Sequence, residues 1–249
     1  MKVADAVSAS LVTRTVGLPP VAPGTIQVWS DLLCPFAHLA LHRIRQARER
    51  LGVDLPIEHR TFALELFNGP HPRRGTDTEA VGVGQAAPEL DWRVWAAPDD
   101  VYPHTVLLAA EAVHAARAQS LAAGEALDLA LRRAFWTGSR SISLRDVVLE
   151  IAGETAAGTA LDVPVLDVAA LTEALDSGRH RAEVFADHAV ARTDAIAGSP
   201  TMRLADGTTV TNPGTEVAWA GPWAAGFPII GRHDATVLDE LVRRAAATA

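Results

Sequence analysis

The fold of this chain is decided by the stretch TIQVWSDLLCPFAHLALHRIRQARERL, residues 25–51. Residues 25–30 are mostly β-branched or aromatic and alternate roughly, which is typical of a strand. From Pro35 onward, apolar residues recur every three to four positions, which predicts a helix up to Leu51. Pro35 suits the first helical position because its missing N–H needs no partner there. Cys34, the single cysteine of the chain, is therefore placed at the start of the helix.

The position of Cys34 gives it a candidate chemical role. A helix N-terminus presents unpaired N–H groups and the positive end of the helix dipole, so it stabilises a thiolate relative to the thiol. We therefore expect the pKa of Cys34 to be lowered and its sulfur to be nucleophilic at neutral pH. His38, four residues further on, is expected to face the sulfur and to add to this effect when charged. The alternative is a small buried side chain without reactivity.

Composition and charge exclude several classes of protein. The formal net charge of -8 argues against a nucleic-acid or anionic-membrane surface, because both favour basic patches. No apolar run approaches the length of a membrane span, and residues 1–10 lack the apolar core of a secretory signal, so we expect a cytoplasmic protein. A single cysteine excludes a disulfide framework. His38 and His42 form the sole metal-ligand spacing and have no supporting motif, so we expect no metal site.

The remaining segments indicate an α/β protein with a helical insertion. A second strand is predicted at residues 56–64, and strand, helix and strand in about forty residues form a right-handed unit with parallel strands. Asp206-Gly207 predicts a tight hairpin, and residues 236–247 a final amphipathic helix. The predicted organisation is an N-terminal arm (residues 1–24), an α/β domain (residues 25–65 and 196–249) and a mostly helical insertion (residues 66–195).

Local signals place the ends of several elements. Residues 68–75 are predicted to form a loop, and the pattern stays irregular to about residue 100. Helices are predicted to begin after Ser143–Asp146, which has the spacing of a capping box, and after Asp167. A further loop, rich in glycine and tryptophan, is expected at residues 219–231.

This order of elements resembles a thioredoxin-type fold. Residues 31–36, Asp-Leu-Leu-Cys-Pro-Phe, resemble the active-site start of the DsbA-type thioredoxin-like family, including its FrnE-like branch. Residues 198–201, Gly-Ser-Pro-Thr, resemble the cis-proline loop of that family, and Asp206-Gly207 and Asn212-Pro213-Gly214 are similar to the hairpin and turn of FrnE-like members. The resemblance covers about residues 25–249. It implies that Ser199–Pro200 is cis, lies beside Cys34, and exposes the Ser199 backbone to an extended thiol substrate.

The chain departs from the family pattern at Ala37. Redox-active members carry Cys-x-x-Cys, whereas here Ala37 stands in place of the second cysteine and the chain has no other cysteine. A two-cysteine disulfide cycle is therefore impossible within one subunit. Monothiol chemistry remains: Cys34 attacks a substrate disulfide, forms a mixed disulfide, and is released by a low-molecular-weight thiol such as glutathione or mycothiol. We therefore favour a monothiol thiol-disulfide oxidoreductase or isomerase.

Two alternatives stay open. The layout also resembles kappa-class glutathione transferases and 2-hydroxychromene-2-carboxylate isomerases, which lack the cysteine pair. In those enzymes the residue at the helix start activates a bound thiol cofactor, so Cys34 would orient a cofactor sulfur rather than attack. The second alternative is a non-catalytic thioredoxin-like binding scaffold, in which Cys34 is a remnant.

The candidate site combines the motifs with one aromatic residue. Trp92 and Trp95 are three residues apart and can share one face of a short helical turn, where they line a cleft or join the core. The expected partner is a small-molecule or peptide thiol or disulfide; a tightly bound cofactor is not expected, and a homodimer is left open. The candidate catalytic residues are Cys34, Pro35 and His38, and the candidate substrate-binding residues are Phe36, Trp95, Ser199, Pro200 and Thr201.

Overall fold

The computed structural model describes residues 17–158, 166–222 and 225–249. The part of the predicted N-terminal arm at residues 1–16 lies outside the described residues. The main sheet has the strand order β2-β1-β3-β4. Its parallel β1–β2 pair confirms the predicted strand–helix–strand unit, and β3 runs antiparallel to both of its neighbours. The strands are β1 (Ile26–Ser30), β2 (Ile57–Thr61), β3 (Thr201–Arg203) and β4 (Thr209–Thr211).

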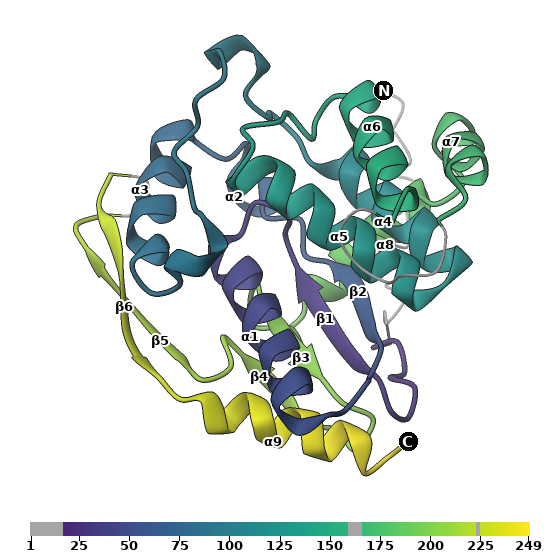
Figure 1. Ribbon diagram of the computed structural model, residues 1–249, viewed down its shortest axis with the longest axis vertical. Coiled ribbons are helices and arrows are strands. Elements are labelled where there is room, and N and C mark those ends of the chain that lie inside the picture. Colours follow the sequence, from purple (N-terminus) through teal and green to yellow (C-terminus); the bar gives the residue numbers. More distant parts are fainter. Residues whose placement is uncertain (1–16, 159–165, 223–224) are drawn as a thin grey trace, which may run out of the picture.

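Helices make up the described elements between β2 and β3 (Figure 1). The first helix and the last, α1 (Pro35–Leu51) and α9 (Ala235–Ala246), flank this block in the sequence. The predicted helical insertion therefore agrees with the element order, while its exact boundaries stay a prediction. The helices of the block are α2 (Glu65–Asn68), α3 (Arg73–Gly84), α4 (Leu107–Gln119), α5 (Leu121–Trp136), α6 (Arg145–Ala156), α7 (Val168–Ser177) and α8 (Arg181–Ala191).

Two large hydrophobic clusters hold the chain together. In the first, α1 and α9 pack on one face of the main sheet, where Ile26 and Val28 of β1 meet Leu41 of α1 and Leu238 of α9. The second lies within the helical block and includes Leu127 of α5. Figure 1 shows α9 running across the base of the sheet and α4 to α8 gathered on the opposite side of β2. The loop that carries Cys34 follows β1 of the first cluster and packs its two leucines into the second.

Helix ends follow the local sequence signals in most places. Gly52 ends α1 in the left-handed conformation that favours glycine (φ 62°), and the Asp167 side chain caps α7 by accepting a hydrogen bond from Ala170 N. The capping box predicted at Ser143 is wrong. Leu144 precedes the first residue of α6 without a side-chain cap, because the Ser143 hydroxyl donates to Thr105 O at 2.5 Å instead.

Three regular elements lie wholly or partly in stretches that the sequence indicates as irregular. The helix α3 begins at Arg73, inside the predicted loop 68–75, and β5 (Thr215–Ala220) and β6 (Phe227–His233) form an antiparallel two-stranded sheet where a loop is expected at 219–231. The glycines of α3 hide its helical pattern, and Gly82 has a packing reason: a Cβ there would lie 2.5 Å from the Pro228 carbonyl oxygen. These predictions are therefore corrected.

Candidate active site

Cys34 occupies the position immediately before α1. Its backbone is extended (φ -82°, ψ 113°), and Pro35 is the first helical residue, as predicted. The Cys34 N–H donates to Asp31 O at 3.2 Å, which closes a turn between β1 and the helix. The thiol donates to Ser199 O at 3.2 Å, and the residue is 3% exposed. The sulfur therefore lies at the mouth of the helix, in contact with the Ser199–Pro200 segment.

The Ser199–Pro200 peptide bond is cis. Besides its carbonyl contact with Cys34, Ser199 accepts a hydrogen bond through its hydroxyl oxygen from Asp31 N at 3.0 Å. Pro200 is buried, and its carbonyl accepts from Asn212 N at 3.0 Å, beside the β3–β4 hairpin. Segments far apart in the sequence thus meet around one sulfur, with Ser199 attached to the Cys34 turn at both its backbone and its side chain.

The protonation state of Cys34 differs from the expectation. Burial raises the pKa of the Cys34 thiol to about 12. The Ser199 hydroxyl and the backbone N–H of Ala37 favour the thiolate, while the carboxylates of Glu79 and Asp31 favour the thiol and add to the rise. The predicted lowering of the pKa is therefore wrong for the resting protein, because loss of hydration outweighs the helix terminus. Cys34 is a thiol at neutral pH and acts as a hydrogen-bond donor.

His38 does not assist the sulfur as a cation. Its side chain is fully buried, and its ring packs edge-on against Trp92 with 5.0 Å between ring centroids. Burial lowers the pKa of His38 well below its ordinary value, and the charges of Arg132 and Arg45 act in the same direction. The imidazole is therefore neutral, and the prediction that a charged His38 stabilises the thiolate is corrected.

Asp31 and His71 form a pair at this site that sequence reasoning misses. The Asp31 carboxylate accepts from Leu33 N at 2.7 Å and from Leu64 N at 2.8 Å, and His71 Nε2 lies 3.5 Å from its Oδ1. Burial opposes charging of the imidazole, but the Asp31 carboxylate, with Glu79, raises the pKa of His71 above its ordinary value. No local signal marks His71, which lies forty residues away in a proline-rich loop.

Phe36 lies on the side of the site that faces the β5–β6 hairpin. Its ring is half-buried and meets Trp219 of β5 edge-on at 6.5 Å between ring centroids, and Ile230 of β6 packs against the same small cluster as Phe36. Phe36, next but one to Cys34, thus connects the sulfur region to this hairpin. The sequence singles out Phe36 but gives no signal for its aromatic partner.

Thr201 and Trp95 do not face the sulfur. The Thr201 side chain is fully buried, and its hydroxyl lies 2.8 Å from the Thr211 hydroxyl across the β3–β4 pair. Trp95 is buried against Tyr102 and Phe135 in the core of the helical block, in a segment without helical turns. Thr201 therefore joins the two strands of a hairpin, and Trp95 takes the core position, one of the two placements that the sequence left open. Substrate binding by either residue stays a prediction.

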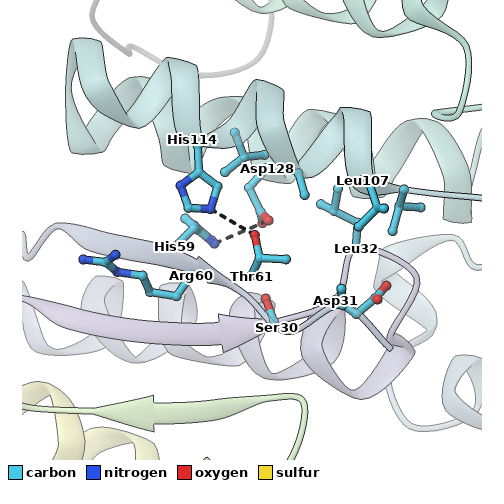
Figure 2. A pocket seen from close by; sticks show the side chains of 13 residues that line it. Ser30, Asp31, Leu32, His59, Arg60, Thr61, Leu107, His114 and Asp128 are labelled. Carbon is cyan, nitrogen blue, oxygen red and sulfur yellow. Dashed lines mark hydrogen bonds and ion pairs between the residues drawn. The ribbon is translucent and has the colours of Figure 1, made fainter. Parts of the chain in front are cut away.

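A small cavity with both polar and apolar lining residues lies behind the Cys34 turn, between β2 and the helices α4 and α5. Figure 2 shows Thr61 and His114 in contact, with His59 beside Asp128. The Thr61 hydroxyl lies 3.0 Å from His114 Nε2, and His59 Nδ1 lies 3.4 Å from Asp128 Oδ1. The cavity measures about 20 Å³, which is room for one water molecule and too little for a substrate.

Two further findings concern the described residues. They contain no group of three or more histidine, cysteine, aspartate or glutamate side chains arranged to hold a metal ion. None of the helices they form combines the length and apolar character that crossing a bilayer requires. The contacts around Cys34 define the candidate active site. It consists of the Cys34 turn and the Ser199–Pro200 loop, with Phe36 at its side and Asp31 beneath it.

Comparison with known proteins agrees with this geometry. A model of the DSBA-like thioredoxin domain matches residues 25–218, and no curated protein matches the chain. The structure is similar to a probable DsbA oxidoreductase from Streptomyces coelicolor, with a TM-score of 0.61 and 20% identity over 90% of this chain and 91% of that chain. It is also similar to the cytosolic disulfide reductase DsbM from Pseudomonas aeruginosa, with a TM-score of 0.52 and 20% identity over 75% of this chain and 89% of that chain.

A third similar structure is a 2-hydroxychromene-2-carboxylate isomerase, with a TM-score of 0.50 and 15% identity over 75% of this chain and 87% of that chain. At these identities the similar structures establish the fold, and the proteins named are thiol-disulfide enzymes and an isomerase. The family model spans most of the sequence, including the Cys34 turn and the Ser199–Pro200 loop. The chain therefore belongs to the DSBA-like thioredoxin domain family.

Proposed function

We propose that the protein catalyses monothiol thiol–disulfide exchange through Cys34. The observation that carries this proposal is the contact of Cys34 Sγ with the Ser199 carbonyl at 3.2 Å, in a chain with a single cysteine. A sulfur at a helix start, beside a cis-proline loop, is placed to meet an incoming disulfide whose chain extends along that loop. Membership of a family that contains oxidoreductases supports the same chemistry.

The proposed cycle balances with one external thiol. Cys34 attacks one sulfur of a substrate disulfide, its proton passes to the departing sulfur, and a mixed disulfide with Cys34 forms while a thiol is released. A low-molecular-weight thiol, glutathione or mycothiol, then attacks the mixed disulfide and passes its own proton to Cys34. The cycle ends with the Cys34 thiol restored and a new disulfide released, so no net oxidant is needed.

Ser199 has a proposed role in both states of this cycle. In the resting protein its carbonyl accepts the hydrogen of the Cys34 thiol. In the mixed disulfide that hydrogen is gone, so the carbonyl can accept an N–H from the substrate. Formation of the covalent bond thereby opens a recognition group 3.2 Å from where the thiol was held. This exchange of donors favours peptide-like substrates with a free backbone N–H.

The side of the site suggests what else a substrate meets. Phe36 and Trp219 present an aromatic pair on the side of the β5–β6 hairpin, so we propose an apolar group next to the reacting sulfur. Pro35 contributes by starting the helix directly after the nucleophile. We also propose a cytoplasmic location, where low-molecular-weight thiols are abundant, and a place in the FrnE-like branch on the basis of the sequence motifs.

One observation favours a second function. A Cys34 held as a thiol of raised pKa is a hydrogen-bond donor rather than a ready nucleophile. Such a donor can orient and stabilise the thiolate of a bound thiol cofactor, which then does the chemistry in a small-molecule isomerase or transferase. In this alternative the covalent bond forms at the cofactor sulfur and never at Cys34.

The variant Cys34→Ser separates the two functions, because serine is also a donor but cannot form a disulfide. The assay follows reduction of a peptide–glutathione mixed disulfide by excess glutathione, with mass spectrometry of the protein. Under monothiol exchange the wild type accumulates a Cys34 adduct and Cys34→Ser loses nearly all turnover. Under the cofactor mechanism Cys34→Ser keeps substantial isomerase or transferase activity and no adduct forms. Absence of both exchange turnover and adduct in the wild type contradicts monothiol exchange. If thiol-dependent isomerase and transferase activities are absent as well, the binding scaffold is left.

A further inference from the structure

A buried arginine on the helical block reaches the Cys34 turn from behind. Arg132 lies on α5 and is 0% exposed. Its guanidinium bonds to groups on both sides of the boundary between the helical block and the sheet. The acceptors are Asp31 O (2.7 Å), Asp128 Oδ2 (2.8 Å), Ser30 Oγ (2.8 Å), Asp128 Oδ1 (3.0 Å) and Leu32 O (3.4 Å).

The groups that Arg132 contacts are the ones that place the reacting atoms. Asp31 O accepts from Arg132 and also from the Cys34 N–H at 3.2 Å, so one carbonyl joins the guanidinium to the turn of Cys34. The N–H of the same Asp31 donates to Ser199 Oγ at 3.0 Å. Asp31 therefore connects Arg132 by hydrogen bonds to both residues of the contact between Cys34 Sγ and Ser199 O.

The geometry requires an arginine at this position. Asp128, one helical turn before Arg132 on α5, holds the guanidinium through two oxygens. The fixed fork of that group leaves its remaining N–H bonds pointing at the loop. A lysine has a single ammonium and cannot pair with Asp128 and bond to Asp31 O, Leu32 O and Ser30 Oγ at once. Asp128 thus orients the guanidinium of Arg132, and Arg132 in turn fixes the position of the loop that carries Asp31.

We propose that Arg132 is a positioning residue, which fixes the Cys34 turn against the Ser199–Pro200 loop without touching substrate. The role rests on the proposed exchange reaction for its effect on turnover, but its effect on the sulfur does not. If the turn loosens, the contact between Cys34 and Ser199 opens and water reaches the thiol. Exchange should then slow down, whereas reaction of Cys34 with a small reagent should speed up. A general loss of stability gives no such opposite pair of changes below the unfolding transition.

The test compares Arg132→Lys with Arg133→Lys, the adjacent and exposed arginine of α5. For Arg132→Lys we expect kcat of exchange to fall on the order of tenfold to a hundredfold with a smaller change in KM. We expect Cys34 to react faster with iodoacetamide at pH 8, and the midpoint of its pH–rate profile to move down, toward that of a hydrated thiol. Arg133→Lys should match the wild type in both assays, at a temperature where circular dichroism shows each variant folded.

The profile is interpreted with the other titratable groups near Cys34 in view. These are Asp31 in its own turn with its partner His71, and Glu79 on α3, while the neutral His38 shares α1 with the sulfur. Ser30→Ala removes one acceptor of Arg132 and leaves the pair with Asp128 intact. It is the second variant if Arg132→Lys does not fold, and it should shift the profile in the same direction by less.

An Arg132→Lys profile identical to that of the wild type, at unchanged kcat, overturns the positioning role. So does a Ser30→Ala profile identical to that of the wild type, where Arg132→Lys cannot be purified. If wild-type protein shows no exchange, the proposed function fails, yet the iodoacetamide profiles still decide whether Arg132 holds the turn. The two failures are therefore distinguishable.

Discussion

At the scale of single residues, the most direct consequence concerns the Cys34 thiol. With the pKa of Cys34 at about 12, only about one molecule in 10⁵ carries a thiolate at pH 7, against a few per cent for an ordinary cysteine. We therefore expect native protein to react with iodoacetamide far more slowly at pH 7 than the same protein unfolded in urea, and the native rate to keep rising up to pH 10. Timed mass spectrometry of the alkylated protein measures both rates. Equal native and unfolded rates at pH 7 would contradict the buried thiol.

His71 predicts a pH dependence of stability. The pKa of His71 is raised in the folded protein by the Asp31 carboxylate, against the opposing effect of burial. A raised pKa means that the pair stabilises the fold fully below the unfolded value of about 6.5, and that this contribution is lost as pH rises through the folded value. His71→Asn should therefore lower the free energy of unfolding at pH 5.5, on the order of 1 kcal/mol, and by much less at pH 9. Urea unfolding at the two pH values measures the difference.

The matched control for His71 is His104, which is exposed. His104→Asn should leave the free energy of unfolding within about 0.5 kcal/mol of the wild type at both pH values. The assignment of a charged His71 does not survive a His71→Asn variant whose deficit is as large at pH 9 as at pH 5.5.

The sequence predicts some residues of the site and misses others for a physical reason. Cys34 and Ser199 each lie in a short linear motif, so their contact follows once the fold is known. The sequence misjudges His38 and leaves the placement of Trp95 open, because side-chain burial depends on helices that pack from elsewhere in the chain. Arg132 is missed because its role exists only through contacts across about a hundred residues, and no local pattern encodes such a contact.

At the scale of elements, the packing of α3 on β6 makes a prediction about glycine. A Cβ at Gly82 would lie 2.5 Å from the Pro228 carbonyl oxygen, so Gly82→Ala must push helix and strand apart. We expect a loss of about 1–3 kcal/mol in the free energy of unfolding. Faster amide hydrogen exchange confined to β5, β6 and α3 would locate the change. The expected order is loss of hairpin protection before loss of the main sheet.

Gly153 in α6 supplies the opposite control. A Cβ at that position meets nothing within 4 Å, so Gly153→Ala should stabilise the protein by about 0.5–1 kcal/mol through helix propensity. Thermal or urea unfolding of both variants tests the pair. A stabilised Gly82→Ala protein would show that α3 and β6 are not in close contact.

Periodicity and turn chemistry predict the elements of the central fold. The helices α1 and α9 carry a helical apolar period, and the strands β1 and β2 contain β-branched or aromatic residues in rough alternation, so the sequence places them nearly where they lie. By contrast, α3 contains glycines that weaken a helical pattern, and its helix is set by contact with β6. The β5–β6 pair has a register shift between Thr215 and Val217, and nearly all of its residues are half-buried or exposed, so it carries only a weak apolar signal.

At the scale of the whole molecule, buried charges join the helical block to the sheet. Burial opposes the charge of Asp128, but Arg132 and His59 lower the pKa of Asp128 to about 2. Its contribution to stability is therefore present above the unfolded value near 3.8 and is lost as pH falls toward 2. Asp128→Asn should cost about 3–5 kcal/mol at pH 7, because it leaves the Arg132 charge buried and unpaired. The cost should shrink as pH approaches 2.

Guanidinium chloride unfolding at pH 7 and pH 3 measures this dependence. Asp54→Asn is the control, because the Asp54 side chain is fully exposed. This variant should leave the free energy of unfolding close to that of the wild type at both pH values. An Asp128→Asn protein as stable as the wild type at pH 7 would mean that the buried pair does not hold the helical block and the sheet together.

The homodimer that the sequence leaves open stays a prediction, which analytical ultracentrifugation can decide.

The β5–β6 hairpin is a separate two-stranded sheet and pairs with no described strand of the main sheet. Even so, its Trp219 meets Phe36, two positions from the sulfur. Substitutions on the hairpin can therefore change the surface beside the reactive sulfur without breaking any strand pairing of the main sheet. We accordingly expect the choice of substrate to depend on the side chains that this hairpin presents beside Phe36.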